Sequence, residues 1–289
     1  MKISTEIASA ARIVGEQRAI ELIAKAGFDA WDFSMFSMPR YSRTAGKMIF
    51  TDHPLCTDNY AAFAKELRKI GEDCGIVCNQ SHAPFPSLPV IYDYLKRAIE
   101  CTAIAGGEIC IIHPDNNKSA EENAEMYFEL LPFAKEHGVK IATENMWNWN
   151  DELGQAAPAA CSYHDDFVKH LDAVNDEYFT ACLDIGHAEM AGLNTTAVDM
   201  IKAIGPRLGA LHVHDNDLRN DSHQIPFSMK IDFDAMVKAL KEVDYKGDMT
   251  LECDCYLHYF CQRDKDKVFE GVQNLANTVK KLVEMFRAQ

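Results

Sequence analysis

The chain has 289 residues, of which 47% are hydrophobic and 25% charged, and its 29 Lys and Arg face 44 Asp and Glu for a net charge of −15. This balance is typical of a folded globular protein and excludes a disordered, collagen-like or coiled-coil chain as the main account. Because so acidic a surface repels phosphate groups, we expect no nucleic acid or membrane partner.

Eight short apolar segments punctuated by Gly, Asp or Pro follow one another along the chain and predict β-strands. They are KISTEIA at 2–8, DAWDFSM at 29–35, GIVCNQSH at 75–82, EICIIHP at 108–114, VKIATEN at 139–145, YFTACLDIGH at 178–187, LGALHVHD at 208–215 and DMTLECD at 248–254. Between them, apolar residues at helical spacing predict helices over 15–27, 58–75, 89–107, 120–138, 233–247 and 266–286. Pro132 predicts either a kink or a late start in the helix over 120–138.

Strand–helix repeats of this number and length predict an α/β fold, a single (β/α)8 TIM barrel over residues 1–289. The alternative is a doubly wound open sheet. No GxGxxG motif follows the first strand, which argues against the dinucleotide-binding form of that fold. Two long connections, at about 35–58 and 147–163, belong in a barrel to the C-terminal rim, where they would wall the active site.

No run of about 20 apolar residues is present, so no membrane span is expected. The N-terminal segment carries Glu6 and Glu16 and lacks the apolar region of a signal peptide, which favours a cytoplasmic protein. The ten cysteines are scattered through apolar runs without paired CxxC motifs. We expect reduced and mostly buried thiols.

Metal-ligand side chains gather at the predicted strand ends, where barrel enzymes build their active sites. Ten of them fall at or just after the ends of strands three to eight: His82, His113, Glu144, Asp184, His187, His212, His214, Asp221, His223 and Glu252. A buried polar network that plugs the barrel is the structural alternative. Burying these carboxylates without a cation is costly, and Arg219 is the nearest basic residue, so we favour a divalent metal site.

Carboxylate and imidazole ligands without thiolate suit Mn²⁺, Mg²⁺, Co²⁺, Fe²⁺ or Zn²⁺. His212 and His214 lie two residues apart and share a strand face. We expect one to ligate the metal, while the other packs below it or contacts substrate.

The segments SHAPF, IIHP, TEN, LDIGHAEMAG, LHVHDND with NDSH, and LECD, in this order, resemble the xylose isomerase-like TIM barrel superfamily. Within it, the chain is similar to the sugar phosphate isomerase/epimerase group, which is related to endonuclease IV. The resemblance implies a metal held by Glu144, Asp184, His212 and Glu252, with His212 favoured because Asp215 follows three residues later. It implies Mn²⁺ first, with Mg²⁺, Co²⁺ or Zn²⁺ as alternatives.

The resemblance also implies a sugar, sugar phosphate or keto-sugar isomerase or epimerase that works through an enediolate. Glu144 and Glu252 would then act as acid and base as well as ligands. Trp147 and Trp149 could stack on the sugar or simply pack their loop. We expect substrate contacts from His82, His113, Trp147, His187, His214 and Arg219, and related enzymes are often dimers or tetramers.

Other functions stay open. Nine of the ten residues, all except His214, match the ligand set with which endonuclease IV holds three zinc ions, so Asp221 and His223 could hold an additional metal. A dehydratase or lyase could start from the same enediolate, and a non-catalytic sugar-binding barrel is a further alternative. The chain lacks the PGEG-like segment of many relatives and reads QIPFSMKIDF there. Arg40, Arg43 and Lys47 could hold an anion, although we favour a solvated surface for that loop.

Overall fold

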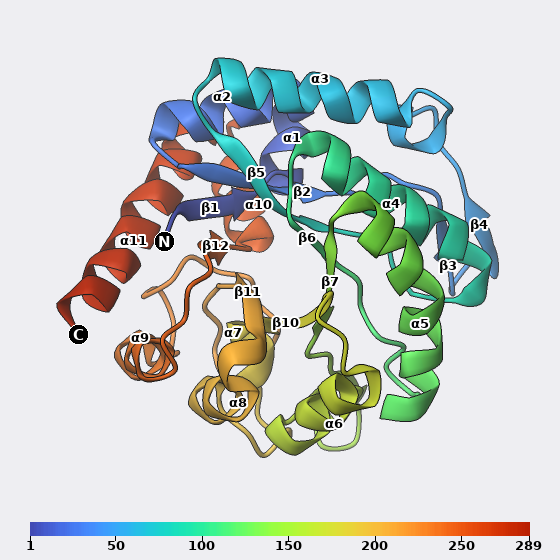
Figure 1. Ribbon diagram of the computed structural model, residues 1–289. Helices are drawn as coiled ribbons and strands as arrows, with labels where there is room; N and C mark the ends of the chain where they lie inside the picture. The colour runs from blue at the N-terminus through green and yellow to red at the C-terminus, as the bar shows by residue number, and fades with distance from the viewer.

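Eight parallel strands surround a central axis in the computed structural model, which describes residues 1–289. Helices form an outer ring around them (Figure 1). The strands, in spatial order, are β11 (Leu208–His212), β10 (Phe179–Asp184), β7 (Lys140–Glu144), β6 (Ile109–Ile111), β5 (Val77–His82), β2 (Ala30–Ser34), β1 (Ile3–Glu6) and β12 (Met249–Leu251). The predicted (β/α)8 barrel is confirmed, and each of the eight predicted segments supplies one strand.

The barrel closes between β11 and β12 through an isolated bridge just past the end of β11. A parallel bridge joins Val213 to Leu251, and the Val213 backbone N–H donates to the Thr250 carbonyl at 2.9 Å. The alternative of an open, doubly wound sheet is therefore excluded, because such a sheet keeps two separate edges.

Burial on both faces explains the nearly continuous apolar strands. All four residues of β1 and all six of β10 are buried. A cluster of 71 buried apolar residues fills the space between strands and helices. Inside the barrel, Ile111, Ala142, Cys182 and Ala210 form a small separate cluster. Three of these four residues are Ala or Cys, which leave room for the larger polar side chains at the strand ends.

The chain forms eleven α-helices. They are α1 (Ala8–Val14), α2 (Glu16–Ala26), α3 (Tyr60–Asp73), α4 (Tyr92–Ala105), α5 (Ala120–His137), α6 (His164–Val174), α7 (Ile185–Ala188), α8 (Ala197–Ile204), α9 (Phe233–Glu242), α10 (Asp254–Cys261) and α11 (Val268–Ala288). Four short 3-10 turns lie at Pro54–Cys56, Pro89–Ile91, Gly205–Arg207 and Lys265–Lys267. Gly27, Gly106 and Gly138 end their helices in the left-handed conformation, as glycine allows without strain.

Helix α5 does not start late. A capping box between Ser119 and Glu122 satisfies the first backbone N–H groups, so the helix begins at Ala120 and continues through Pro132. Helices α1, α6, α7, α8 and α10 were not among the helices predicted from the sequence.

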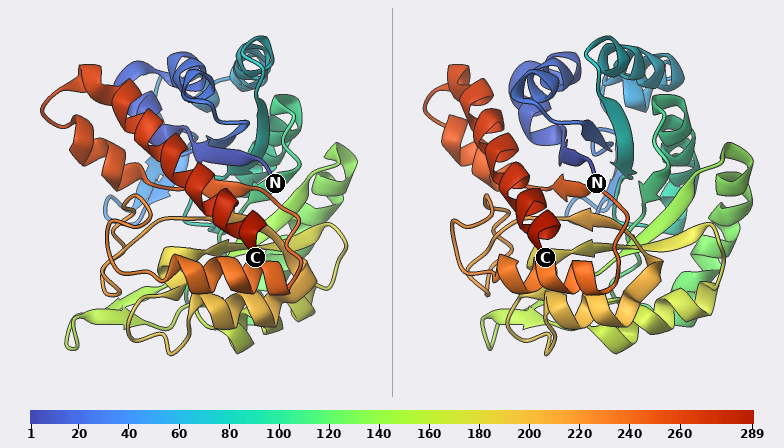
Figure 2. Two further views of the ribbon diagram at one scale, coloured as in Figure 1. Left: turned by 90° about the vertical axis from the view of Figure 1, so that its left-hand side faces the viewer. Right: turned by 60° about the vertical axis from the view of Figure 1, so that its left-hand side comes forward.

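Both long connections fold into β-hairpins. Residues 35–58 contain β3 (Arg40–Ser42) and β4 (Lys47–Ile49), and residues 147–163 contain β8 (Asn148–Asn150) and β9 (Gln155–Ala157). Figure 2 shows both hairpins at the same end of the barrel. Since they follow β2 and β7, that end is the C-terminal rim, as the sequence predicts.

None of the ten cysteines forms a disulfide, and seven are buried, which agrees with the expectation of mostly buried thiols. No helix has the length and apolar character needed to cross a membrane.

Candidate active site

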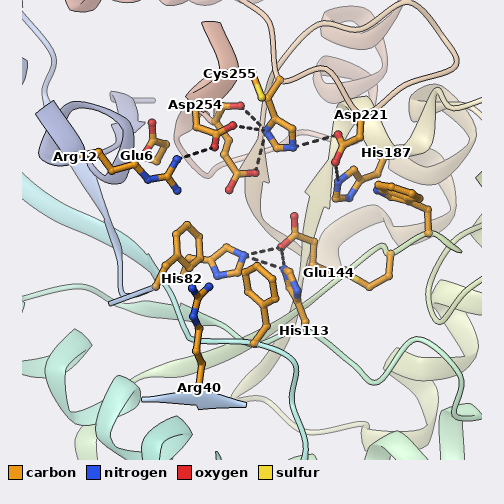
Figure 3. Close-up of a pocket in the computed structure, with 16 residues that line it drawn as sticks. Glu6, Arg12, Arg40, His82, His113, Glu144, His187, Asp221, Asp254 and Cys255 are labelled. Atoms are coloured by element: carbon orange, nitrogen blue, oxygen red, sulfur yellow. Dashed lines mark hydrogen bonds and ion pairs between the residues drawn. The ribbon is translucent and has the colours of Figure 1, made fainter. Parts of the chain in front are cut away.

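A cavity of about 450 Å³ opens at the C-terminal rim (Figure 3). Eight of the residues predicted from strand ends and rim loops line it: His82, His113, Glu144, Trp147, His187, Asp221, His223 and Glu252. Aromatic and polar side chains that the sequence did not single out complete the wall, among them Phe36, Phe85 and Asp254. Most side chains expected at the site therefore converge on one cavity.

The four ligands implied by the resemblance lie together. One potential ligand atom from each of Glu144, Asp184, His212 and Glu252 falls within 4.8 Å of the others. His212 Nδ1 lies 2.8 Å from Glu144 Oε1 and 3.4 Å from Glu252 Oε2. Strands β7, β10 and β11 end on these residues, and Glu252 follows β12, so the barrel itself fixes their spacing.

Glu144 also joins a second group through its other oxygen. Its Oε2 lies 3.1 Å from His113 Nε2 and 3.6 Å from His82 Nε2, and the two imidazole nitrogens are 2.9 Å apart. A single carboxylate thus bridges two clusters of potential ligands.

A third group lies toward β10 and the loop after β11. It contains His187, His214, Asp221 and His223. His223 Nε2 lies 3.1 Å from Asp221 Oδ1, and the rings of His214 and His223 stack with centroids 3.9 Å apart. His214 is fully buried and does not line the cavity, whereas His187 and His223 do.

Three cavity histidines are held in one orientation by the backbone. In His82, His187 and His223, Nδ1 lies 2.8–2.9 Å from a backbone carbonyl oxygen. Because a carbonyl only accepts, Nδ1 must carry the hydrogen. In the neutral ring Nε2 then keeps its lone pair, and in each case it faces a carboxylate 3.1–3.6 Å away. Metal-binding histidines are oriented in this way.

Two carboxylate oxygens among these groups lack hydrogen bonds. Asp184 Oδ1 accepts from the His187 backbone N–H at 2.7 Å, but Asp184 Oδ2 is buried without a partner. Asp221 Oδ1 is also buried and faces His223 outside hydrogen-bond geometry. Since unpaired buried carboxylate oxygens are costly, the donor set fits a divalent cation better than a self-satisfied polar plug.

The paired charges shift the pKa values strongly. Burial raises the pKa of Glu144, but His212, His113 and His82 outweigh it and lower that pKa well below its usual value. Burial raises the pKa of Glu252 despite the opposing charges of His212 and His223. The pKa values of the two glutamates are therefore shifted in opposite directions.

The pKa values of two cavity histidines also shift in opposite directions. Burial, with the charge of His82, lowers the pKa of His113 to about 4. For His187 burial also lowers the pKa, but the carboxylates of Asp184 and Asp221 outweigh it and raise that pKa to about 10. A bound cation would compete with the proton on the raised histidines.

A buried network below the cavity orients His212. Its Nε2 lies 3.4 Å from Asp32 Oδ2, which also accepts from Gln80 Nε2 at 2.9 Å. With Nε2 directed at Asp32, the Nδ1 atom is left to face Glu144 and Glu252. Asp32 and Gln80 are partners on the neighbouring strands β2 and β5. Alternation along a strand does not reveal that Asp32 meets His212 across the barrel.

Close backbone approach fixes the end of β10. A Cβ atom on Gly186 would lie 1.9 Å from His214 Cε1, so any side chain there would displace the ring. Asn145 donates from Nδ2 to the Asp184 carbonyl at 2.9 Å and accepts from the Asp184 backbone N–H at 2.8 Å. These contacts hold β7 and β10 in register at the site.

Some expected contacts lie elsewhere. Arg219 donates from Nε to the Gly154 carbonyl at 2.7 Å and does not line the cavity. Trp149 is 40% exposed and does not line the cavity. Trp147 lines it and packs against the cluster of Ala156, Met190 and Leu193. We therefore leave Arg219, Trp149 and the buried His214 out of the substrate contacts proposed below.

Glu6, which ends β1, is a cavity residue that the sequence could have indicated by the strand-end rule used for the other strands. It accepts hydrogen bonds from the Ser9 backbone N–H at 2.9 Å and from the Ser9 hydroxyl. Burial outweighs these bonds and raises the pKa of Glu6 to about 7.

Glu6→Gln is expected to flatten the pH dependence of stability in metal-free protein. The pKa of Glu6 is higher in the folded protein than in the unfolded chain. Its contribution to the free energy of unfolding is therefore complete below pH 4.5 and is lost as the pH rises to 7. The loss is about 3 kcal/mol. Urea unfolding with EDTA at pH 5, 6, 7 and 8 measures it. Glu125→Gln, on the exposed face of α5, should keep the wild-type slope, and a wild-type slope in Glu6→Gln would contradict the expectation.

Comparisons with known proteins agree with the barrel. The family model described as xylose isomerase-like TIM barrel matches residues 20–287. An uncharacterized protein of Methanocaldococcus jannaschii is 24% identical over 254 residues, which cover 81% of this chain and 78% of that protein.

Solved structures of similar fold cover nearly all of the chain. A D-tagatose 3-epimerase-like protein superposes with a TM-score of 0.71 at 19% identity, covering 100% of this chain and 99% of that one. The D-allulose 3-epimerase of Methylomonas sp. in complex with D-allulose gives 0.68 at 15% identity, with 97% and 96% covered. The IOLI protein with a bound zinc atom gives 0.71 at 17% identity, with 99% of both chains covered. The match over residues 20–287 shows that the chain belongs to the xylose isomerase-like TIM barrel family.

Proposed function

We propose that the protein is a divalent-metal-dependent isomerase or epimerase of a keto-sugar or sugar derivative. The proposal rests on one observation: the carboxylates of Glu144 and Glu252 both lie against the His212 side chain at the cavity. They share His212 Nδ1 at 2.8 and 3.4 Å, and both line the cavity.

The proposed metal ligands are Glu144, Asp184, His212 and Glu252. A divalent cation bound to this set would stabilise the negative charge of an enediolate formed from a ketose. Mn²⁺ is our first expectation, with Mg²⁺, Co²⁺ and Zn²⁺ as alternatives. The zinc atom in the IOLI protein supports a divalent metal in this type of barrel without choosing among them.

The chain's own groups account for the proton movements. Epimerisation or isomerisation of a ketose removes a proton from a carbon next to the carbonyl and returns a proton to the same or the neighbouring carbon. Glu144, with its lowered pKa, is ionised and can accept a proton as the carboxylate. Glu252, with its raised pKa, is suited to carry one.

The remaining cavity residues would bind and orient the sugar. His82, His113 and His187 offer polar contacts around the ligand groups, and Trp147 offers an apolar surface. The structural neighbours described as epimerases, one with D-allulose bound, support a small sugar as the ligand. We expect no nucleic acid partner, and a cytoplasmic location and homo-oligomers stay predictions of the sequence.

A multi-zinc phosphodiesterase is the second candidate. The three groups of potential ligands around one cavity, two of which share Glu144, favour it. In that case Asp221 and His223 would hold an additional metal. The net charge of −15 argues against a duplex DNA substrate. A dehydratase or lyase that uses the same enediolate is the third candidate.

Product analysis separates these functions. The metal-loaded protein is incubated with a panel of ketoses, and the products are identified by NMR. An epimer or aldose without loss of water supports the proposal, whereas a dehydrated or cleaved product assigns the protein to the third candidate. Cleavage of an abasic-site duplex in the presence of Zn²⁺, with no change in any sugar, would overturn the proposal in favour of the second.

A further inference from the structure

A side cavity adjoins the active-site cavity near α1 and β3. It has a volume of about 420 Å³, and it shares Arg12, Phe36 and Arg40 with the active-site cavity. Figure 3 shows Arg12 entering from the left and Arg40 from below, whereas His187 and Asp221 lie on the right. The two arginines therefore stand where the two cavities meet, away from the third group of potential ligands.

Arg40 has no partner for its charge. No carboxylate oxygen lies within 4.0 Å of its guanidinium, and its side chain makes no hydrogen bond. Arg40 is exposed, and five carboxylates line the same cavity without pairing with it: Glu6, Glu144, Asp221, Glu252 and Asp254. By contrast, Arg43 of the same hairpin reaches Asp115 at 4.0 Å. The free guanidinium of Arg40 is thus available to a ligand in the cavity.

Arg12 is only loosely held. Its Nη1 lies 3.4 Å from Asp254 Oδ2, and 57% of the Arg12 side chain is exposed. Exposed pairs of this kind contribute little to stability. An anion that enters the cavity can therefore bind the Arg12 guanidinium in place of Asp254 at a small cost in free energy.

A buried hydroxyl supplies a third donor. Ser34, the last residue of β2, lines the side cavity and is 9% exposed, and its Oγ has no hydrogen-bond partner. Buried hydroxyls are normally paired, so an unpaired one in a cavity wall indicates a group that a ligand would satisfy.

We propose that Arg12, Arg40 and Ser34 form an anion subsite for a phosphate or carboxylate group on the substrate. Guanidinium groups bind both anions through paired hydrogen bonds, and the serine hydroxyl can donate a further one. The inference rests on the proposed function and narrows its substrates to keto-sugars that carry a phosphate or an acid group. That group lies in the side cavity, while the carbonyl end faces Glu144 and Glu252.

Calorimetric binding tests the subsite without requiring turnover. D-fructose, D-fructose 6-phosphate and D-fructuronate are titrated into metal-loaded and EDTA-treated protein. We expect at least one of the two anions to bind about 10- to 100-fold more tightly than the neutral sugar, as charged hydrogen bonds of this kind provide. Preference for the phosphate identifies a sugar phosphate as the substrate class, and preference for the uronate identifies a sugar acid.

Variants locate the effect. In Arg40→Gln the ratio of the anion and neutral-sugar affinities should fall to within about twofold, whereas Arg43→Gln should keep the wild-type ratio. No anion preference in the wild type, an unchanged ratio in Arg40→Gln, or an equal loss in Arg43→Gln would overturn the subsite. Selective anion binding without turnover of any sugar would refute the proposed function but support the subsite. Turnover of neutral ketoses without a preference for anions would support the proposed function but refute the subsite.

Discussion

Glu144→Gln and Glu252→Gln are each expected to lower kcat by about a thousandfold or more while leaving the barrel folded. Glutamine keeps the shape of the side chain but can neither hold a proton nor carry the charge that binds a cation, and positioned acids and bases contribute about 10²- to 10⁴-fold. Glu144 should show the larger loss, because it contacts His212 through Oε1 and faces His113 through Oε2 at 3.1 Å.

Steady-state kinetics at saturating metal, with circular dichroism melting as a check on folding, measures both variants. The matched control is Glu125→Gln, a glutamate on the exposed face of α5 without an ion pair. Full activity in either active-site variant would rule out the two-glutamate mechanism.

Removal of divalent metal is expected to abolish turnover, and replacement of the metal should restore it. Without a cation, the orphaned Asp184 Oδ2 and the facing carboxylates stay uncompensated. Binding at a hundred times the dissociation constant adds about 2.7 kcal/mol of stability, so the melting temperature should rise by roughly 5 °C on metal addition.

Dialysis against EDTA, elemental analysis and readdition of Mn²⁺, Mg²⁺, Co²⁺ or Zn²⁺ measure this dependence. Asp184→Asn should weaken the restoration by the preferred metal, because it removes a ligand charge. Full activity in protein shown by elemental analysis to contain no divalent metal would contradict the account.

Strand order and strand ends were predictable from the sequence because they depend on local patterns. Each apolar run from KISTEIA to DMTLECD became a barrel strand, and in a parallel barrel all strand C-termini meet at one rim. This geometry explains why His82, Glu144 and Glu252, far apart in sequence, line one cavity.

Contacts across the barrel were not predictable, because no local pattern encodes them. The pairing of Asp32 with His212 depends on the stagger between strands that are 180 residues apart in sequence. The sequence places His214 on the same strand face as His212, but His214 packs closely against Gly186 and belongs to the third group. The sequence favours a solvated surface over an anion site for Arg40, Arg43 and Lys47, and all three are exposed. That Arg40 also lines the active-site cavity depends on the fold of the hairpin.

Deuterium exchange tests the central claim most directly. The metal-loaded protein is incubated with a substrate ketose in D2O, and NMR follows deuterium at the carbon next to the carbonyl. The account predicts deuterium at that carbon in the epimer or isomer and in the recovered substrate. It also predicts that the Glu144→Gln variant incorporates no deuterium. A product formed with complete retention of the original hydrogen, or exchange that persists unchanged in Glu144→Gln, would contradict it.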